Sequence, residues 1–461
     1  MGRRVIIRGG VLGTEHGLYR ADLVVDGERI ASITRDASDL EADEQIDARG
    51  MFVLPGGIDV HTHFKDPNTL PLEGFYTGSL GAIAGGVTTV IEMPQAVPVC
   101  TDGTSVAVKR LVGEAQSIVD FALWGGAINQ SLDQIDEMID AGVVAIKSFM
   151  SSSSPTFPRA TDATLVNVFR HLADLDIPYG LHPENEELLQ TGIANLKAEG
   201  RTDVMAHAES RPPIVEIEAI SRALLFAEKT GGHAYICHCS SIGGLKLIKQ
   251  AKSRGIRVSV ETCPHYLILD EDDLRRLGPF GRCAPAIRSR EEVEGIWRFV
   301  QDGTIDIISS DHCGFSIESK EAGSENIWDA PLGLSGIQTM LPMMLDEMIY
   351  RRNLDIATFV RLMSTNPARV FGLYPRKGSL QVGADADVII YDPDNPWIVR
   401  GGDLLHRHKW SPFEGRDVRG RIVRTIIRGQ TVFRHVGYSV VSAEPGSGRF
   451  LPRGYGQVQV A

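Results

Sequence analysis

Hydrophobic and polar residues alternate one by one in several short segments near the two ends of the chain. These segments are residues 5–8, 23–26, 29–33, 386–391 and 422–429. Strict alternation over a short run is typical of a half-buried β-strand. Asp26-Gly27 separates two of the segments and favours a tight hairpin turn. The pattern predicts a small all-β unit at the N-terminus and strands of the same style near the C-terminus.

The middle of the chain follows a different pattern, in which short apolar runs alternate with longer amphipathic segments. The apolar runs predict eight strands, at residues 58–60, 88–93, 121–124, 145–149, 179–182, 234–238, 258–262 and 305–311. Helical patterns such as 214–229 and 241–253 separate most of them. Eight strands that alternate with helices favour a (β/α)₈ barrel. An open doubly wound sheet is the alternative, which is disfavoured because no Gly-x-Gly-x-x-Gly motif follows an early strand.

Charge and composition exclude some classes of function. The 461 residues include 47 Lys and Arg against 59 Asp and Glu, which gives a formal net charge of −12. We expect no nucleic-acid partner, because such a protein needs a basic face. We also expect no membrane partner, since no apolar run reaches the roughly 18 residues of a membrane span. The N-terminus lacks the pattern of a signal peptide.

The six cysteines are scattered along the chain, at Cys100, Cys237, Cys239, Cys263, Cys283 and Cys313. We expect no disulfides and a reducing, cytoplasmic location. Cys237-His238-Cys239 resembles a metal-binding run, but the alternation of a strand would point both sulfurs away from the face of His238. We therefore expect no metal site built from cysteines.

Polar residues stand at the ends of several predicted strands, where a TIM barrel carries its catalytic groups. His61 and His63 end the first strand and are two residues apart, so both should point to one face. His182 and His238 end the fifth and sixth strands, and Asp311 ends the eighth. Each alone could be a satisfied polar group of the core. Together they predict a divalent metal site, because imidazoles and carboxylates are its usual ligands.

Lys147 lies inside the fourth predicted strand, Ala145-Ile146-Lys147-Ser148-Phe149. Burial and nearby cations favour the neutral amine over the ammonium. A neutral amine can take up carbon dioxide, and the resulting carbamate has two oxygens that can bridge two metal ions. A lysine that extends along the barrel rim is the alternative. The neighbouring histidines favour the carbamate.

Five segments carry a family resemblance: residues 57–63, 146–150, 261–267, 310–313 and 377–387. Together they resemble the cyclic amidohydrolases of the amidohydrolase superfamily, which are hydantoinase, dihydropyrimidinase, allantoinase and dihydroorotase. The resemblance covers residues 3–440. It implies an α/β fold, a (β/α)₈ TIM barrel with a small β-sandwich domain built from both termini. The implied parts are residues 1–53 and 376–440 for the sandwich, 54–375 for the barrel and 441–461 for a C-terminal tail.

The resemblance also implies two divalent metal ions, zinc with manganese, cobalt or iron as alternatives, and carbon dioxide bound as a carbamate on Lys147. By motif position the metal ligands would be His61, His63, Lys147, His182, His238 and Asp311. A hydroxide that bridges the ions would attack the amide. Asp311 would be the catalytic residue, which takes the proton of the hydroxide and passes it to the leaving nitrogen.

Shorter segments indicate which branch of this family, and therefore which substrate, the chain resembles most. Residues 121–126, 337–342 and 408–413 look like the L-hydantoinase and allantoinase branch, in which backbone groups near Ala284 and Leu332 would bind the imide of the ring. Lys65 stands where dihydroorotases have a carboxylate-binding arginine, which disfavours that activity. Serines at 151–154 replace a tyrosine that is typical of dihydropyrimidinases. We expect a hydantoin-like substrate first, allantoin second and a dihydropyrimidine third.

A second class of function remains, since some relatives lack the metal ligands and act as scaffold proteins. Every expected ligand position is filled here, so an enzyme is favoured. The expected partners are a small-molecule cyclic amide and further copies of the chain in a homo-tetramer. His265 is a feature of the family that we expect to be structural.

Overall fold

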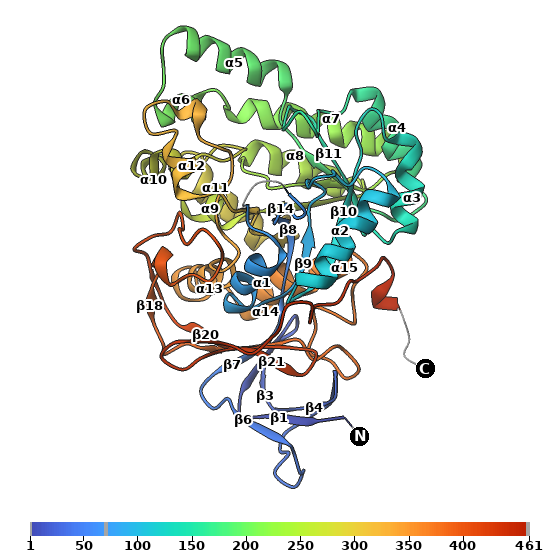
Figure 1. Ribbon diagram of the computed structural model, residues 1–461, viewed down its shortest axis with the longest axis vertical. Helices are drawn as coiled ribbons and strands as arrows, with labels where there is room; N and C mark the ends of the chain where they lie inside the picture. Colours follow the sequence, from blue (N-terminus) through green and yellow to red (C-terminus); the bar gives the residue numbers. More distant parts are fainter. Residues whose placement is uncertain (1, 69–71, 458–461) are drawn as a thin grey trace.

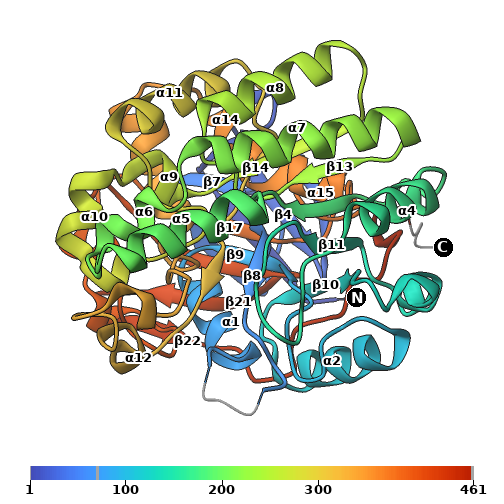
Figure 2. The same cartoon turned by 90° about the horizontal axis from the view of Figure 1, so that it is seen from above.

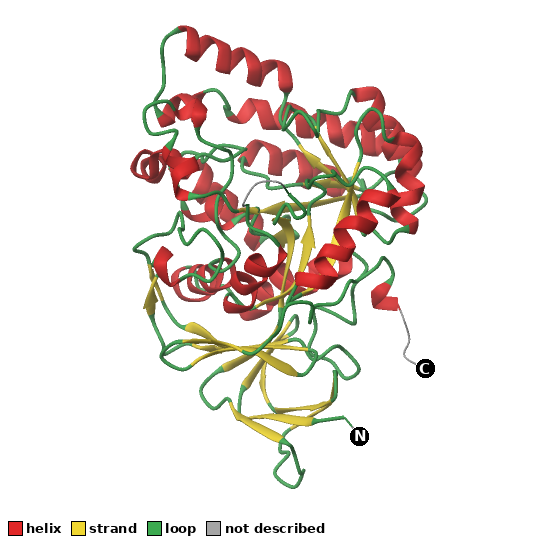
Figure 3. Cartoon of the chain, viewed as in Figure 1, coloured by secondary structure: helices red, strands yellow, loops and turns green. Residues whose placement is uncertain are grey.

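A β-sandwich occupies one end of the molecule and a barrel of strands and helices the other (Figures 1 and 3). The computed structural model describes residues 2–68 and 72–457. Figure 1 shows blue and red strands next to one another in the sandwich, so segments from the N-terminal and C-terminal parts of the chain meet there.

The barrel is a single parallel sheet of nine strand segments in the order β15-β14-β13-β12-β11-β10-β9-β8-β16. The segments are β8 (Gly57–His63), β9 (Val87–Glu92), β10 (Asp120–Gly126), β11 (Ala145–Phe149), β12 (Tyr179–His182), β13 (Ala234–Ile236), β14 (Val258–Thr262), β15 (Ile307–Ile308) and β16 (His312–Cys313). The edge segments β15 and β16 are two halves of one interrupted strand, so the sheet closes through the chain itself. This arrangement confirms the predicted (β/α)₈ barrel.

Helices surround the strands, as the view from above shows (Figure 2). The longer ones are α1 (Phe75–Ala84), α2 (Gly103–Gln116), α4 (Asp162–Leu172), α5 (Glu186–Ala198), α7 (Pro213–Thr230), α8 (Ile242–Ser253) and α11 (Arg290–Gln301). The shorter ones are α3 (Ile135–Asp140), α6 (Val204–Glu209), α9 (Pro264–Ile268), α10 (Glu271–Leu277), α12 (Ile317–Glu321), α13 (Met340–Leu345), α14 (Ile356–Val360) and α15 (Asn366–Val370).

Helix α11 illustrates why these segments fold as they do. Ser289 caps its N-terminus by accepting a hydrogen bond from the backbone N–H of Glu292. Val293, Ile296 and Val300 are buried at the three- and four-residue spacing of one helix face. The charged residues of the same helix therefore face solvent while its apolar side packs on the barrel.

The sandwich consists of a four-stranded and a seven-stranded sheet. The first contains β1 (Arg4–Arg8), β4 (Asp22–Asp26), β5 (Arg29–Thr34) and β6 (Glu44–Asp47). The second contains β2 (Val11–Thr14), β3 (Gly17–Arg20), β7 (Phe52–Pro55), β17 (Val388–Asp392), β20 (Arg421–Ile427), β21 (Gln430–His435) and β22 (Ser439–Val441). Strand β17 pairs with β7, so strands from both ends of the chain share one sheet. The predicted sandwich from both termini is confirmed, as is the hairpin turn at Gly27, where φ is 60°.

Buried ion pairs connect the sandwich to the barrel. Lys377 Nζ lies 2.5 Å from Asp120 at the start of β10 and 2.7 Å from Asp387 just before β17. Near the C-terminus, the backbone N–H of Leu451 donates to Phe121 O at 2.7 Å, so this end of the chain packs on the barrel. The division into residues 1–53, 54–375, 376–440 and 441–461 stays a prediction, and residues 458–461 of the expected tail lie outside the described residues.

A membrane span would need a long apolar helix, and none of the helices in the described part of the chain meets that requirement.

Candidate active site

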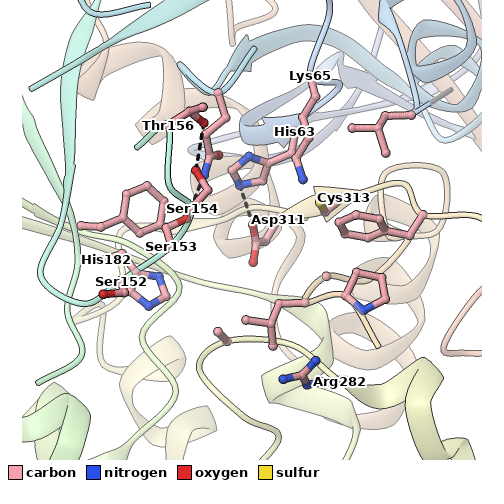
Figure 4. Close-up of a pocket in the computed structure, with 18 of the residues that line it drawn as sticks. His63, Lys65, Ser152, Ser153, Ser154, Thr156, His182, Arg282, Asp311 and Cys313 are labelled. Atoms are coloured by element: carbon pink, nitrogen blue, oxygen red, sulfur yellow. Dashed lines mark hydrogen bonds and ion pairs between the residues drawn. The ribbon is translucent and has the colours of Figure 1, made fainter. Parts of the chain in front are cut away.

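The predicted site residues meet at the carboxyl ends of the barrel strands, around a cavity of about 530 Å³ (Figure 4). The cavity lining includes the metal-ligand candidates His61, His63, His182, His238 and Asp311 and the substrate-contact candidates Ala284 and Leu332. Lys147 is fully buried in the middle of β11. The eight residues that sequence reasoning singled out therefore lie in or beneath one cavity.

His61, His63 and Asp311 form the first group of metal-ligand candidates. The Nε2 atom of His61 lies 3.2 Å from Asp311 Oδ1, and the Nε2 atom of His63 lies 3.3 Å from the same oxygen. Figure 4 shows His63 and Asp311 facing each other across this contact. One oxygen and two ring nitrogens thus converge on a point that one cation can occupy.

His182 and His238 form the second group. The Nδ1 atom of His182 lies 2.9 Å from Nε2 of His238. The other nitrogen of His182, Nε2, lies 2.8 Å from Glu184 Oε2, and Arg211 Nη1 donates to the same carboxylate. A carboxylate on the far nitrogen fixes the ring orientation of a metal-binding histidine. The ring of His238 lies 5.3 Å from that of His61, so the two groups adjoin.

Two site residues have left-handed backbone conformations, which are rare for residues other than glycine. The φ angle is 35° at His238 and 48° at Asp311. At Asp311 this conformation interrupts the eighth strand, which the sequence pattern predicted as continuous over 305–311. Strained backbone of this kind is typical of functional sites, where it aims a side chain into the cavity.

Cys237 contradicts the prediction that its sulfur points away from the site. Strand β13 ends at Ile236, and the chain leaves the extended conformation at His238, so strand alternation does not apply there. Lys147 Nζ donates to Cys237 Sγ at 2.8 Å. The six cysteines are free and buried. Cys237 is therefore a neighbour of Lys147 that the sequence did not reveal.

Burial and charge set the protonation of Asp311 and of three of the four histidines in a way that suits metal binding. Burial lowers the pKa of His63 to about 3, and it lowers the pKa of His182 and His238 as well. Burial opposes the charge of Asp311, but His61 and His63 hold the pKa of that carboxyl well below its usual range. Neutral imidazoles and an ionised carboxylate are the forms that bind divalent ions.

His61 differs from the other histidines because it lies between two carboxylates. Burial alone would lower its pKa, yet the charges of Glu261 and Asp311 raise that pKa to about 10. Its Nδ1 atom hydrogen-bonds Glu261, which leaves Nε2 directed toward Asp311.

Sequence reasoning missed Glu261 as a functional residue. Its carboxylate accepts hydrogen bonds from the Tyr235 hydroxyl at 2.6 Å and from the backbone N–H of His238 at 3.1 Å, besides contacting His61. A charged residue within the predicted barrel strand 258–262 was the available signal, since buried charges are rare without a partner.

We expect Glu261→Gln to weaken divalent metal binding by about 10–100-fold, the usual effect of losing the partner of a metal-binding histidine. The neutral amide no longer strengthens His61 as a ligand. Its NH₂ group takes the place of one carboxylate oxygen and would face a group that already donates a hydrogen bond. Competition with a chelator measures the affinity. Glu216→Gln is the control, because Glu216 is equally buried but binds Ser240 outside the cavity lining. Equal metal affinity in Glu261→Gln and wild type would contradict the assigned role.

Of the other residues that the sequence singled out, some line the cavity and one does not. Lys65 lines the cavity, and its ammonium lies 4.5 Å from the centre of the Phe315 ring. Serines 151–154 also line the cavity. His265 is buried beside Tyr266 and is not part of the cavity lining that the described residues form. Burial lowers the pKa of His265 to about 4.

Comparison with known proteins gives a consistent picture. A family model described as the amidohydrolase family matches residues 52–432. An allantoinase of Rubrobacter xylanophilus is 40% identical over 451 residues, which cover 97% of both chains. An L-hydantoinase of Paenarthrobacter aurescens is 39% identical over 97% of this chain and 98% of its own.

Solved structures agree with these relatives. The structure of L-hydantoinase (dihydropyrimidinase) from Arthrobacter aurescens has a TM-score of 0.95 and 38% identity, over 98% of this chain and 100% of that one. A crystal structure of dihydropyrimidinase from Brevibacillus agri has a TM-score of 0.90 at 28% identity, over 98% of each chain. The chain belongs to the amidohydrolase family.

Proposed function

We propose that this enzyme hydrolyses the ring of a hydantoin-like cyclic amide, with allantoin as the second candidate substrate and a dihydropyrimidine as the third. The convergence of four histidines and Asp311 above the buried Lys147 carries the proposal. The names of the relatives, allantoinase and L-hydantoinase, support this substrate class and not a scaffold role.

The donor set fits two divalent cations. His61, His63 and Asp311 would hold one ion, and His182 and His238 would hold the other. Lys147, as a carbamate formed with carbon dioxide, would supply the oxygens between them. When bound, such ions lower the pKa of a water molecule and polarise the amide carbonyl. Zinc suits the ligands, and manganese, cobalt and iron are alternatives.

Asp311 is the proposed catalytic residue. Hydrolysis adds the oxygen of water to the amide carbon, breaks the carbon–nitrogen bond and moves one proton to the leaving nitrogen. An ionised carboxylate at the cavity wall can accept that proton and then donate it. Asp59 supports its position, because Asp59 Oδ1 accepts a hydrogen bond at 3.0 Å from the backbone N–H of Ser310, the residue next to Asp311.

The ring of the substrate would lie against the backbone of two segments of the cavity wall. Ala284 and Leu332 are the proposed contacts, since both line the cavity that the metal-ligand candidates share. Backbone N–H and C=O groups there can pair with the alternating carbonyl and N–H groups of an imide. Their contribution is to orient the amide bond toward the site of attack.

The metal content is the first test. We expect about two divalent ions per chain in purified, active protein, measured by elemental analysis, because the donors form two adjoining groups. Removal of the ions by a chelator should abolish hydrolysis, and added zinc or manganese should restore it. Full activity in metal-free protein would contradict the proposal.

A hydrolysis screen is the second test. It compares hydantoin, both enantiomers of a 5-substituted hydantoin, allantoin, dihydrouracil and dihydroorotate. Hydrolysis of a five-membered ureide, with dihydroorotate inert, is the expected result. The homo-tetramer stays a prediction, which light scattering on the purified protein measures.

A further inference from the structure

Lys320 is a buried lysine next to the cavity. None of the proposed catalytic steps uses it. It lies in α12 and is fully buried. Its Nζ atom donates to three backbone carbonyl oxygens, those of Arg282 at 3.1 Å, Pro331 at 3.0 Å and Gly333 at 3.0 Å. No carboxylate lies within ion-pair distance of it among residues 2–68 and 72–457. In the described part of the chain, the hydrogen bonds of the Lys320 Nζ atom therefore all go to backbone oxygens, and burial lowers the pKa of this amine to about 7.

The three carbonyls belong to the two segments that carry the proposed substrate contacts. Arg282 is two residues before Ala284, and Pro331 and Gly333 flank Leu332 on both sides. All five residues line the cavity, whereas Lys320 is not part of the lining formed by the described residues. Lys320 thus binds the segments from behind, on the side away from the cavity.

Other contacts show that the two segments are held together at this place. The backbone N–H of Gly333 donates to Arg282 O at 3.0 Å. The guanidinium of Arg282 donates to Ala330 O and, at 3.2 Å, to Trp328 O. Figure 4 shows the Arg282 side chain at the edge of the cavity. The backbone at Leu332 therefore has its position fixed relative to the backbone at Ala284.

Gly333 shows how close the packing is. Its φ angle is 146°, and a Cβ atom there would lie 2.6 Å from Cys313 Cβ. On the other side, the Lys320 ammonium lies 5.7 Å from the centre of the Trp410 ring, which closes over it. The segment at Leu332 is thus confined between β16 and Lys320, and Lys320 is screened from water.

The stretch that carries Lys320 also carries Asp311. Lys320 is nine positions after Asp311, and β16 and the first three residues of α12 lie between them. If Lys320 were displaced, the carbonyls of Arg282, Pro331 and Gly333 would lose their shared donor and would have to find other partners. The two segments would then shift, and with them the substrate contacts would move relative to Asp311. Few side chains other than lysine offer three donors from a single flexible stem.

We propose that Lys320 is a positioning residue for substrate binding: it fixes the backbone at Ala284 and Leu332 in the geometry that accepts the imide of the ring. This inference rests on the proposed function, because it assumes that these backbone groups bind the substrate. It predicts that loss of the three hydrogen bonds weakens substrate binding more than it slows the chemical step.

The test compares Lys320→Met with Lys320→Gln, which are similar in size but differ in hydrogen-bond donors. Metal-loaded protein is assayed with the ring substrate that wild type hydrolyses fastest in the screen. In Lys320→Met we expect KM to rise at least about tenfold, the equivalent of one lost buried hydrogen bond, while kcat changes less than about threefold. Lys320→Gln should show a smaller rise in KM, because its amide still donates. Hydrogen exchange of the Gly333 amide should be faster in Lys320→Met.

Lys252→Met is the matched control. Lys252 Nζ donates to Thr304 O at 2.7 Å and contacts Asp306 at 2.6 Å, at the opposite end of the barrel. This variant should lose stability without a change in KM. An unchanged KM in folded, metal-loaded Lys320→Met overturns the proposal, as does an equal KM shift in Lys252→Met. If Lys320→Met does not fold, a wild-type KM in Lys320→Gln overturns it. A wild-type enzyme that hydrolyses no cyclic amide overturns the proposed function instead.

Discussion

Asp311→Asn should lower kcat by at least about a hundredfold while KM changes little and most of the metal is kept. A general base contributes about 10²–10⁴-fold to the rate of such a reaction. Asparagine retains the shape and one oxygen for a metal ion, but its amide cannot accept the proton. Because the change affects the chemical step, the loss should fall on kcat and on kcat/KM equally. Steady-state kinetics and elemental analysis of the same preparation measure both quantities.

Asp306→Asn is the matched control for this prediction. Asp306 precedes β15 in the same interrupted strand, but it pairs with Lys252 at the other end of the barrel. Its amide variant should retain wild-type kcat. Near wild-type kcat in fully metal-loaded Asp311→Asn would show that another group carries the proton, and His265 would then be tested first.

The barrel was predictable because its strands are buried on both faces. Such strands are short and rich in apolar residues, and residues 145–149 and 179–182 are strands with the same bounds as predicted. The eighth strand was predicted less well, because Asp311 interrupts it with a left-handed backbone. Hydrophobic periodicity contains no information about one strained residue.

The site was predictable to the extent that it depends on strand ends. In a closed parallel barrel all carboxyl ends lie on one side, so histidines far apart in the sequence must meet there. The side chains that support these histidines follow no such rule. Glu261 contacts His61 from a position 200 residues away, and Cys237 reaches Lys147 because the strand ends early. These contacts depend on packing and turn geometry, which only the structure provides.

Lys147 is the most demanding part of the proposed site, since it must act as an anion. Lys147 forms no ion pair with a carboxylate in the described part of the chain: its Nζ atom donates to the sulfur of Cys237 and lies 5.1 Å from the centre of the Phe149 ring. The side chain is fully buried, and the cavity above it is lined by the four histidines and Asp311. The proposed carbamate would replace the amine by an anion and would supply two oxygens toward the proposed metal ions. Protein prepared with ¹³C-labelled bicarbonate should therefore show a carbamate signal in its carbon NMR spectrum.

Lys147→Ala should lose at least about a hundredfold in kcat, since losing even an outer partner of a metal ligand costs about 10–100-fold. Acetate or propionate with added metal should restore part of the activity, because a small carboxylate can occupy the gap that the side chain leaves. Lys147→Met is the control: its longer side chain fills the gap, so the same acids should not restore activity. Comparable rescue of both variants would mean that the acids act elsewhere. A structure of metal-loaded, active protein with an unmodified ammonium at Lys147 would rule out the carbamate. The two histidine groups would then hold their ions without a bridging ligand.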